Sequence, residues 1–128
     1  MIIKIPVSLG ELIDKISILK IKKKNIHGAI KGKLINKEIL LLNERLKASV
    51  GVNKDLKEYL GKLIAVNKRL WKIEDELREY ERQKQFDQKF INLARSVYIT
   101  NDERSKIKLE INKKFGSTII EIKSYKKY

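Results

Sequence analysis

Apolar residues recur at steps of three and four through the middle of the chain, from Asp55 to Gln85. The positions are Leu56, Tyr59, Leu63, Val66, Leu70, Ile73, Leu77 and Tyr80. This spacing places the side chains along one side of an α-helix for about four heptads. Neighbouring apolar positions widen the stripe, as is typical of a helix buried in a bundle, and these are Leu60, Ile64 and Trp71. The pattern predicts one long central helix over residues 54–83.

An amphipathic helix is also predicted near the start of the chain, after an extended lead-in at residues 1–7. Ser8 and Glu11 form a capping box, in which the hydroxyl accepts from the first turn and the carboxylate reaches back. The buried side of this helix is expected to carry Leu9, Leu12, Ile13, Ile16 and Leu19. The helix should run to about Asn25 and end before Gly28.

A second amphipathic stripe precedes the central helix. Its apolar positions are Ile35, Ile39, Leu42 and Leu46. This helix is expected to end before Gly51, and Asn53 is a suitable N-cap for the central helix. Because the connection between the two helices is short, the sequence predicts that they form an antiparallel hairpin.

The apolar register fails after Tyr80, which indicates a break at residues 83–87. A new stripe then predicts a fourth helix ending near Ile99, and its positions are Phe86, Phe90, Leu93 and Val97. The segment Thr100–Glu103 matches another capping box, with Asn101 or Asp102 as alternative caps. A fifth helix is therefore expected to begin there and to end at Gly116.

These stripes predict an all-α fold, a helical bundle of about five helices built on the central helix. Residues 1–7 and 118–128 are expected to be short extended segments that pair weakly with each other. The chain of 128 residues has no linker and no internal repeat, so a single helical-bundle domain over residues 1–128 is predicted. The apolar stripe of the central helix is longer than the shorter helices can cover. A homo-oligomer is therefore expected, in which a second copy buries the rest of the stripe.

The composition excludes several classes of site. The chain has no cysteine, which removes disulfides, thiolate zinc sites and cysteine nucleophiles. It has no apolar run of membrane-spanning length and no cleavable leader pattern. The sequence therefore predicts a soluble cytoplasmic protein without a membrane partner.

The net charge of +14 raises the question of nucleic-acid binding. The excess lies at the two ends, because residues 1–50 carry 11 basic and 4 acidic groups and residues 105–128 carry 7 and 2. Of the 30 basic residues, 24 are lysine, whereas base recognition and bidentate phosphate binding favour arginine. Non-specific nucleic-acid binding through the lysine-rich ends is therefore an alternative, and a solvated lysine surface is the favoured interpretation.

Two polar clusters form the candidate ligand-binding site. The first shares one side of the central helix and consists of Trp71, Glu74, Asp75 and Arg78. The second straddles the expected start of the fifth helix and consists of Arg95, Tyr98, Asn101, Asp102 and Arg104. Free backbone N–H groups at a helix start, together with arginines, can hold a phosphate or carboxylate. The structural alternatives are surface ion pairs in the first cluster and helix caps in the second.

An enzyme is the alternative class. Glu11 and Asp14 on the first helix, facing Glu74 and Asp75, resemble in outline the Mg²⁺ site of all-α nucleotide pyrophosphohydrolases, although the spacing fits that pattern poorly. No phosphate-binding loop, zinc motif or nucleophile elbow occurs, so the sequence identifies no reaction. No cofactor is predicted for a binding module. Mg²⁺ is predicted only for the alternative, an enzyme that acts on nucleotides or phosphorylated substrates.

Several stretches together resemble one family of bacterial and phage proteins of about this length, whose function is unknown. They are Ser8–Lys15, Leu70–Arg78, Phe90–Tyr98, Asn101–Arg104, Gly116–Ser117 and Lys123–Tyr125. In that family a similar stretch is sometimes appended to larger proteins associated with glycosyl transfer. The resemblance covers nearly the whole chain and implies a self-contained module that shares Lys15 and the polar residues named above.

The run Glu11–Lys24 also resembles the opening helix of all-α chorismate mutases, which bind a dicarboxylate. The arginines that this resemblance requires are missing from the run. The leading hypothesis is therefore a small helical binding module for a partner protein or an anionic ligand. Its binding face is expected where the two polar clusters meet.

Overall fold

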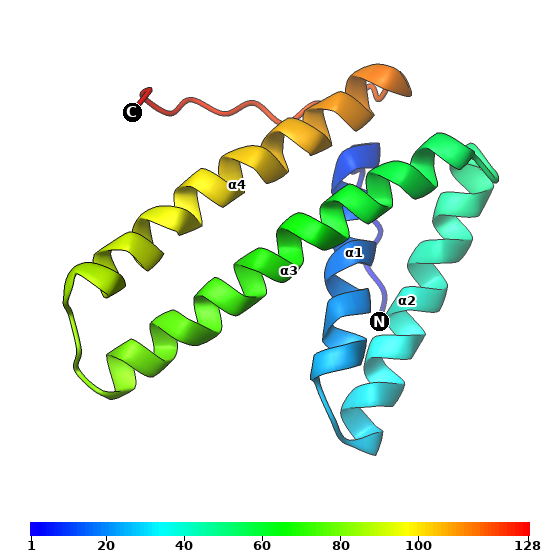
Figure 1. The fold of residues 1–128 in the computed structure, drawn as a ribbon. Coiled ribbons are helices and arrows are strands. Elements are labelled where there is room, and N and C mark those ends of the chain that lie inside the picture. Colours follow the sequence, from blue (N-terminus) through cyan, green and yellow to red (C-terminus); the bar gives the residue numbers. More distant parts are fainter.

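The computed structural model describes all 128 residues and contains four α-helices and no strand. In chain order the helices are α1 (Leu9–Asn25), α2 (Ala29–Val50), α3 (Lys54–Arg82) and α4 (Gln88–Lys114), drawn in Figure 1. The predicted all-α class is confirmed, and the number of helices is corrected from about five to four. None of the four helices combines the length and the apolar character needed to cross a membrane.

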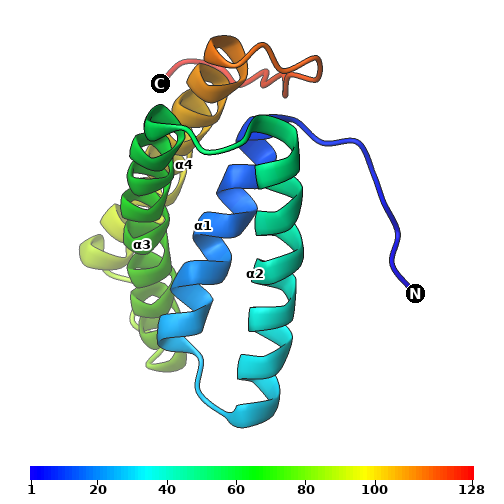
Figure 2. The same ribbon diagram turned by 90° about the vertical axis from the view of Figure 1, so that its right-hand side faces the viewer.

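The helices form two antiparallel hairpins, α1 with α2 and α3 with α4 (Figures 1 and 2). Helix α1 packs against all three other helices, whereas α2 packs only along α1. The predicted hairpin of α2 with α3 is therefore wrong. Gly51 adopts φ 74°, which lets the chain change direction sharply, and the wide stripe of α3 packs against α1 and α4 instead.

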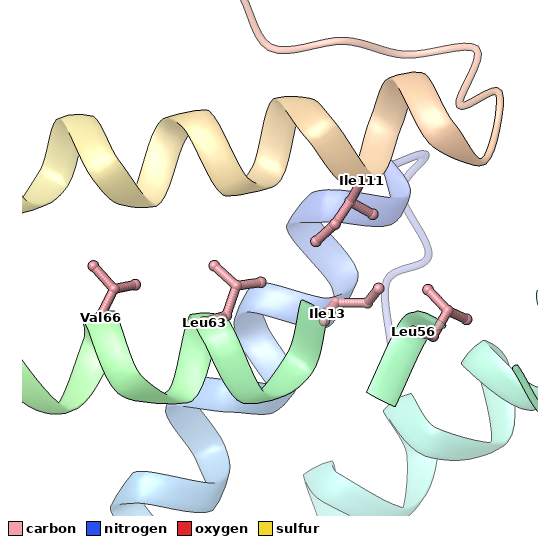
Figure 3. Close-up of a cluster of buried hydrophobic side chains, with 5 residues drawn as sticks. All are labelled: Ile13, Leu56, Leu63, Val66 and Ile111. Carbon is pink, nitrogen blue, oxygen red and sulfur yellow. The ribbon is translucent and has the colours of Figure 1, made fainter. Parts of the chain in front are cut away.

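The main core lies where α1 crosses the α3–α4 hairpin. It contains Ile13 from α1, three side chains from α3 and Ile111 from α4 (Figure 3). The three from α3 are Leu56, Leu63 and Val66, which belong to the predicted central stripe. The predicted stripe of α1 is confirmed as well, because Leu12, Ile13, Ile16 and Leu19 are buried.

Two predicted helix caps and one predicted break between helices are confirmed. The Ser8 hydroxyl accepts from the Glu11 N–H at 3.1 Å at the start of α1, whereas the Glu11 carboxylate pairs with Lys108 instead of reaching back to complete the predicted capping box. The Asn53 side chain accepts from the Asp55 N–H at 2.8 Å and begins α3. The predicted break at residues 83–87 separates α3 from α4.

The predicted fifth helix does not exist as a separate element, because Thr100–Glu103 lies inside α4. No proline or glycine interrupts the helix there, and Thr100 is buried. The polar side chains that suggested a cap have other partners, one in the tail and one on the next turn of α4. Asp102 accepts from the Tyr128 hydroxyl at 2.6 Å, and Asn101 accepts from Arg104 at 3.5 Å. These bonds replace the capping role that their residue types suggest.

The two terminal segments are extended but do not pair with each other, which corrects the expectation of weak pairing. Residues 1–7 are exposed and lead away from the helices (Figure 2). After α4 the chain turns at Gly116 with φ 66°, and the C-terminal tail, residues 118–128, runs back along α4 (Figure 1). The side chains of α4 hold the tail, so they determine where a site can form.

Candidate functional site

The first turn of α1 is hydrogen-bonded to the end of α4 and to the residues just after it. The Gly10 N–H donates to the Asn112 side-chain oxygen at 2.7 Å, and the Leu9 N–H donates to the Ser117 hydroxyl at 3.3 Å. With the Ser8 cap, these bonds satisfy three of the N–H groups that a helix start leaves free, those of Leu9, Gly10 and Glu11. This helix start is therefore occupied by the protein's own side chains.

A buried polar network joins α1, α3 and α4. Asp14 is fully buried and accepts from the Asn67 amide at 2.9 Å and from Arg104 Nε at 2.9 Å, with a second bond from Arg104 Nη2. Asn67 also donates to the Ser17 hydroxyl at 2.8 Å. Donating these hydrogen bonds to the Asp14 carboxylate raises the pKa of Arg104. The network therefore fixes the charged guanidinium in one orientation.

Lys108 lies between two carboxylates beside this network. Its ammonium is 2.7 Å from Glu11 Oε2 and 2.9 Å from Glu121 Oε2, and its side chain is 11% exposed. Burial alone would lower the pKa of Lys108, but the hydrogen bonds to Glu11 and Glu121 outweigh it and raise the pKa. Lys108 thus ties the tail to α1 as well as to α4.

The tail is held at two points. Hydrogen bonds from Lys123 and then from Lys108 lower the pKa of Glu121 from 4.5 to about 2, so this carboxylate stays ionised at neutral pH. At the end of the chain the Tyr128 ring packs edge-on against Tyr98, with ring centroids 5.1 Å apart. The hydrogen bond from its hydroxyl to Asp102 raises the pKa of Tyr128.

A hollow of about 740 Å³, here called the tail hollow, lies between α4, the start of α1 and the C-terminal tail. Four basic side chains line it, and they are Arg104, Lys108, Lys123 and Lys126. Three acidic and three tyrosine side chains also line it, and they are Glu11, Asp102, Glu121, Tyr98, Tyr125 and Tyr128. The remaining side chains are Val97, Asn101 and Ser105. The lining therefore combines charged hydrogen-bonding groups with aromatic surface.

The structure brings together most of the second predicted cluster. Four of its five members line the tail hollow, and they are Tyr98, Asn101, Asp102 and Arg104. The fifth, Arg95, is exposed on α4 outside the hollow and donates to the Tyr98 hydroxyl at 3.4 Å. The predicted residues therefore reach one site through the fold of α4 and the tail, without a helix start.

The first predicted cluster, on α3, does not line the tail hollow. Trp71 is half-buried and Asp75 is exposed. Glu74 pairs with Arg78 at 3.1 Å on the surface of the helix, which is the structural alternative considered for this cluster. Binding at this face stays a prediction separate from the tail hollow.

The four carboxylates of the magnesium alternative do not assemble into a metal site. Glu11 pairs with Lys108, Asp14 with Arg104, and Glu74 with Arg78. No group of three histidine, cysteine, aspartate or glutamate side chains is placed to hold a metal ion. The ligand set for that alternative is therefore not formed in this fold.

Sequence reasoning missed several residues that build the site, among them Gly10, Asn67, Lys108, Asn112 and Glu121. Asn67 falls four residues after Leu63 and three before Leu70, so helical spacing alone places a polar side chain among apolar ones. A buried amide there requires partners, which was the available signal. Glu121 gave no such signal, because its role depends on the path of the tail.

The fold and the site define a four-helix, all-α domain with a charged hollow walled by its own tail. Residues 3–128 match the family of unknown function DUF6165. The chain belongs to this family. Comparisons with curated proteins and with solved structures found no match. A function must therefore be argued from the site itself.

Proposed function

We propose that the tail hollow binds a small anionic ligand that carries a phosphate or carboxylate group. The observation that carries the proposal is the set of four basic side chains lining one hollow. Three of them pair with the protein's own carboxylates, whereas Lys126 makes no ion pair within the chain. Lys126 is therefore the group with a free charge for a ligand.

Prior positioning of the neighbouring groups supports the same proposal. Asp14 fixes the position of the Arg104 guanidinium. The Arg104 N–H groups that face away from Asp14 would therefore lose little conformational entropy on binding an anion. Ser105 and Asn101 add neutral hydrogen-bonding groups, and Tyr125 offers a ring for apolar contact. A few polar groups placed against aromatic surface are typical of small-molecule sites.

The size of the hollow favours a small ligand over a partner protein. Pockets for small molecules have volumes of about 300–1,000 Å³, and the hollow has about 740 Å³. A protein partner needs a broad exposed surface. The tail limits access to the groups of α4, since Glu121 and Tyr128 are attached there.

Isothermal titration with inorganic pyrophosphate and with citrate tests the proposal. Lys126→Gln should weaken binding by about ten-fold or more, because a charged hydrogen bond to the ligand is lost. The matched control is Lys113→Gln, which removes the same charge from an exposed position of α4 outside the hollow. The control should bind like the wild type.

Two results would contradict the proposal. The first is the absence of binding heat for both anions. The second is equal weakening by Lys126→Gln and Lys113→Gln, which would show a general effect of net charge.

A further inference from the structure

The tip of the α1–α2 hairpin, residues 20–37, is a strongly basic surface far from the tail hollow. It contains seven lysines and no acidic residue. None of these lysines makes an ion pair within the chain. In Figure 1 this tip and the turn of the α3–α4 hairpin point in different directions, so the tip stands clear of the rest of the molecule.

Large apolar side chains are exposed on the same tip. Ile30 is 78% exposed and Leu34 is 64% exposed. Their spacing of four residues places both on one side of α2, and Lys33 and Lys37 fall beside them. The opposite side of the helix carries the buried Ile35 and packs on α1, so the outer side has no partner in the chain.

We propose that this outer side of the tip binds the surface of a membrane that contains acidic lipids. A helix with exposed apolar residues flanked by lysines suits the boundary between headgroups and acyl chains. Each lysine near an acidic lipid surface adds to the attraction. The protein would lie on the surface without crossing it, so this proposal departs from the sequence-based expectation of no membrane partner, which rested on the absence of a spanning segment. The tip would bind independently of a ligand in the tail hollow.

Two other partners fit the surface less well. The tip has no arginine, tyrosine, phenylalanine or tryptophan for base edges or base stacking, and nucleic-acid phosphates would not require exposed Ile30 and Leu34. A second copy of the chain would bring two sets of seven lysines together. Like charges at an interface oppose such an association.

Sedimentation with lipid vesicles tests the inference on the full chain. The protein should sediment with vesicles that mix phosphatidylserine into phosphatidylcholine and not with vesicles of phosphatidylcholine alone. Binding to the acidic vesicles should weaken as salt is added, because salt screens the lysines.

Charge variants locate the surface. Lys33→Gln with Lys37→Gln should lower the partition coefficient roughly thirty-fold, since each lysine accounts for about five-fold. The matched control is Lys57→Gln with Lys68→Gln on α3, where both side chains are exposed and make no ion pair. The control should lower the partition coefficient by only a few-fold.

An apolar variant distinguishes the membrane from other polyanions. Ile30→Ser with Leu34→Ser keeps the net charge and should lower vesicle binding about ten-fold, because less apolar surface enters the lipid. Binding of a short DNA duplex, followed by fluorescence anisotropy, should be unchanged by this variant. The melting temperature of the variant protein should stay close to the wild-type value, since both substituted side chains are exposed.

Several outcomes would overturn the inference. Vesicle binding unaffected by the apolar variant would show simple charge attraction, and equal losses in the two lysine pairs would remove the tip as the site. DNA binding that depends on Lys33 and Lys37, without vesicle binding, would assign the surface to nucleic acid. A dimer in sedimentation velocity that the apolar variant dissolves would assign it to a second copy.

Discussion

Gly10 lies where the first turn of α1 meets α4. The close approach of the two helices leaves no room for a side chain at this position. A Cβ at this position would lie 2.6 Å from the Lys108 backbone oxygen and 3.0 Å from the Asn112 side-chain oxygen. Because a backbone oxygen cannot rotate away, Gly10→Ala should lower the free energy of unfolding by about 1–3 kcal/mol. Urea denaturation followed by circular dichroism measures the change.

Gly61→Ala is the matched control for this substitution. Gly61 lies inside α3, and a Cβ there would meet no atom within 4 Å. Alanine is the better helix former, so this variant should raise the free energy of unfolding by up to about 1 kcal/mol. Effects of the same sign and size in both variants would refute the close approach of α1 to α4.

Asp14 is the second residue on which the packing depends. Asp14→Ala should lower the free energy of unfolding by about 3 kcal/mol, because the partly buried Arg104 guanidinium loses its carboxylate partner and Asn67 loses one of its two acceptors. Asp75→Ala, at an exposed position of α3 without an ion pair, should change it by less than about 0.5 kcal/mol. Chemical denaturation compares them.

A second substitution checks the cause of that loss. Adding Arg104→Met to Asp14→Ala removes the uncompensated charge, so the double variant should recover part of the lost stability. If the two losses simply add, the charge on Arg104 does not cause the effect.

The turn between α3 and α4 contains the one residue other than glycine with positive φ. Lys84 adopts φ 54°, a conformation that favours glycine by about 1 kcal/mol over residues with a Cβ. Lys84→Gly should therefore raise the free energy of unfolding by up to about 1 kcal/mol. Lys106→Gly, inside α4, should lower it by about the same amount, and urea denaturation measures both. Destabilisation by both glycines would show that the turn is not strained.

The attachment of the C-terminal tail should depend on pH through Glu121. Its pKa in the folded protein, about 2, lies below the ordinary value of 4.5. The ionised carboxylate therefore holds the tail fully above pH 4.5, and this attachment is lost as the pH falls toward 2. Amide chemical shifts of residues 121–128 should follow that loss.

Glu121→Gln separates this group from the other carboxylates of the chain. The variant should show a loosened tail already at neutral pH and a smaller change on acidification. Glu110→Gln, at an exposed position of α4 without an ion pair, should titrate like the wild type. An unchanged acid response in Glu121→Gln would mean that another carboxylate holds the tail.

Element boundaries that depend on neighbouring residues could be predicted from the sequence, and those that depend on distant partners could not. The Ser8 and Asn53 caps and the break at residues 83–87 are local, and all three are confirmed. The segment Thr100–Glu103 has the same local pattern as a cap. Its distant partners are not visible in that pattern, because Thr100 is buried and Asp102 accepts from Tyr128 in the tail.

The pairing of helices and the site between them lay outside what the stripes could predict. A stripe tells which side of a helix is buried but not which neighbour covers it, and α2 packs on α1 although α3 follows it directly. Four predicted residues meet in the tail hollow because α4 is continuous and the tail returns along it. The tail's path has no local pattern, and the spacing around Asn67 indicates a buried amide without identifying Asp14 as its partner.

The arrangement of the two hairpins predicts unequal local stability. Helix α1 packs against every other helix, whereas α2 packs only on α1 and has one buried residue, Ile35. A region with few buried contacts opens more readily than the core. Native-state hydrogen exchange should therefore show the fastest helical exchange at residues 29–34 and the slowest around Ile13 and Leu63, which are in the main core.

Low concentrations of urea test whether the outer helix opens separately. If α2 opens by itself, exposing little surface, its opening free energy should depend weakly on urea, while that of the amides near Leu63 should fall steeply. Equal protection and equal urea dependence in all four helices would show that α2 unfolds only with the core. Separate opening of α2 is expected because α2 packs only on α1. Helix α1 would stay in place without α2, since α3 and α4 also pack against it.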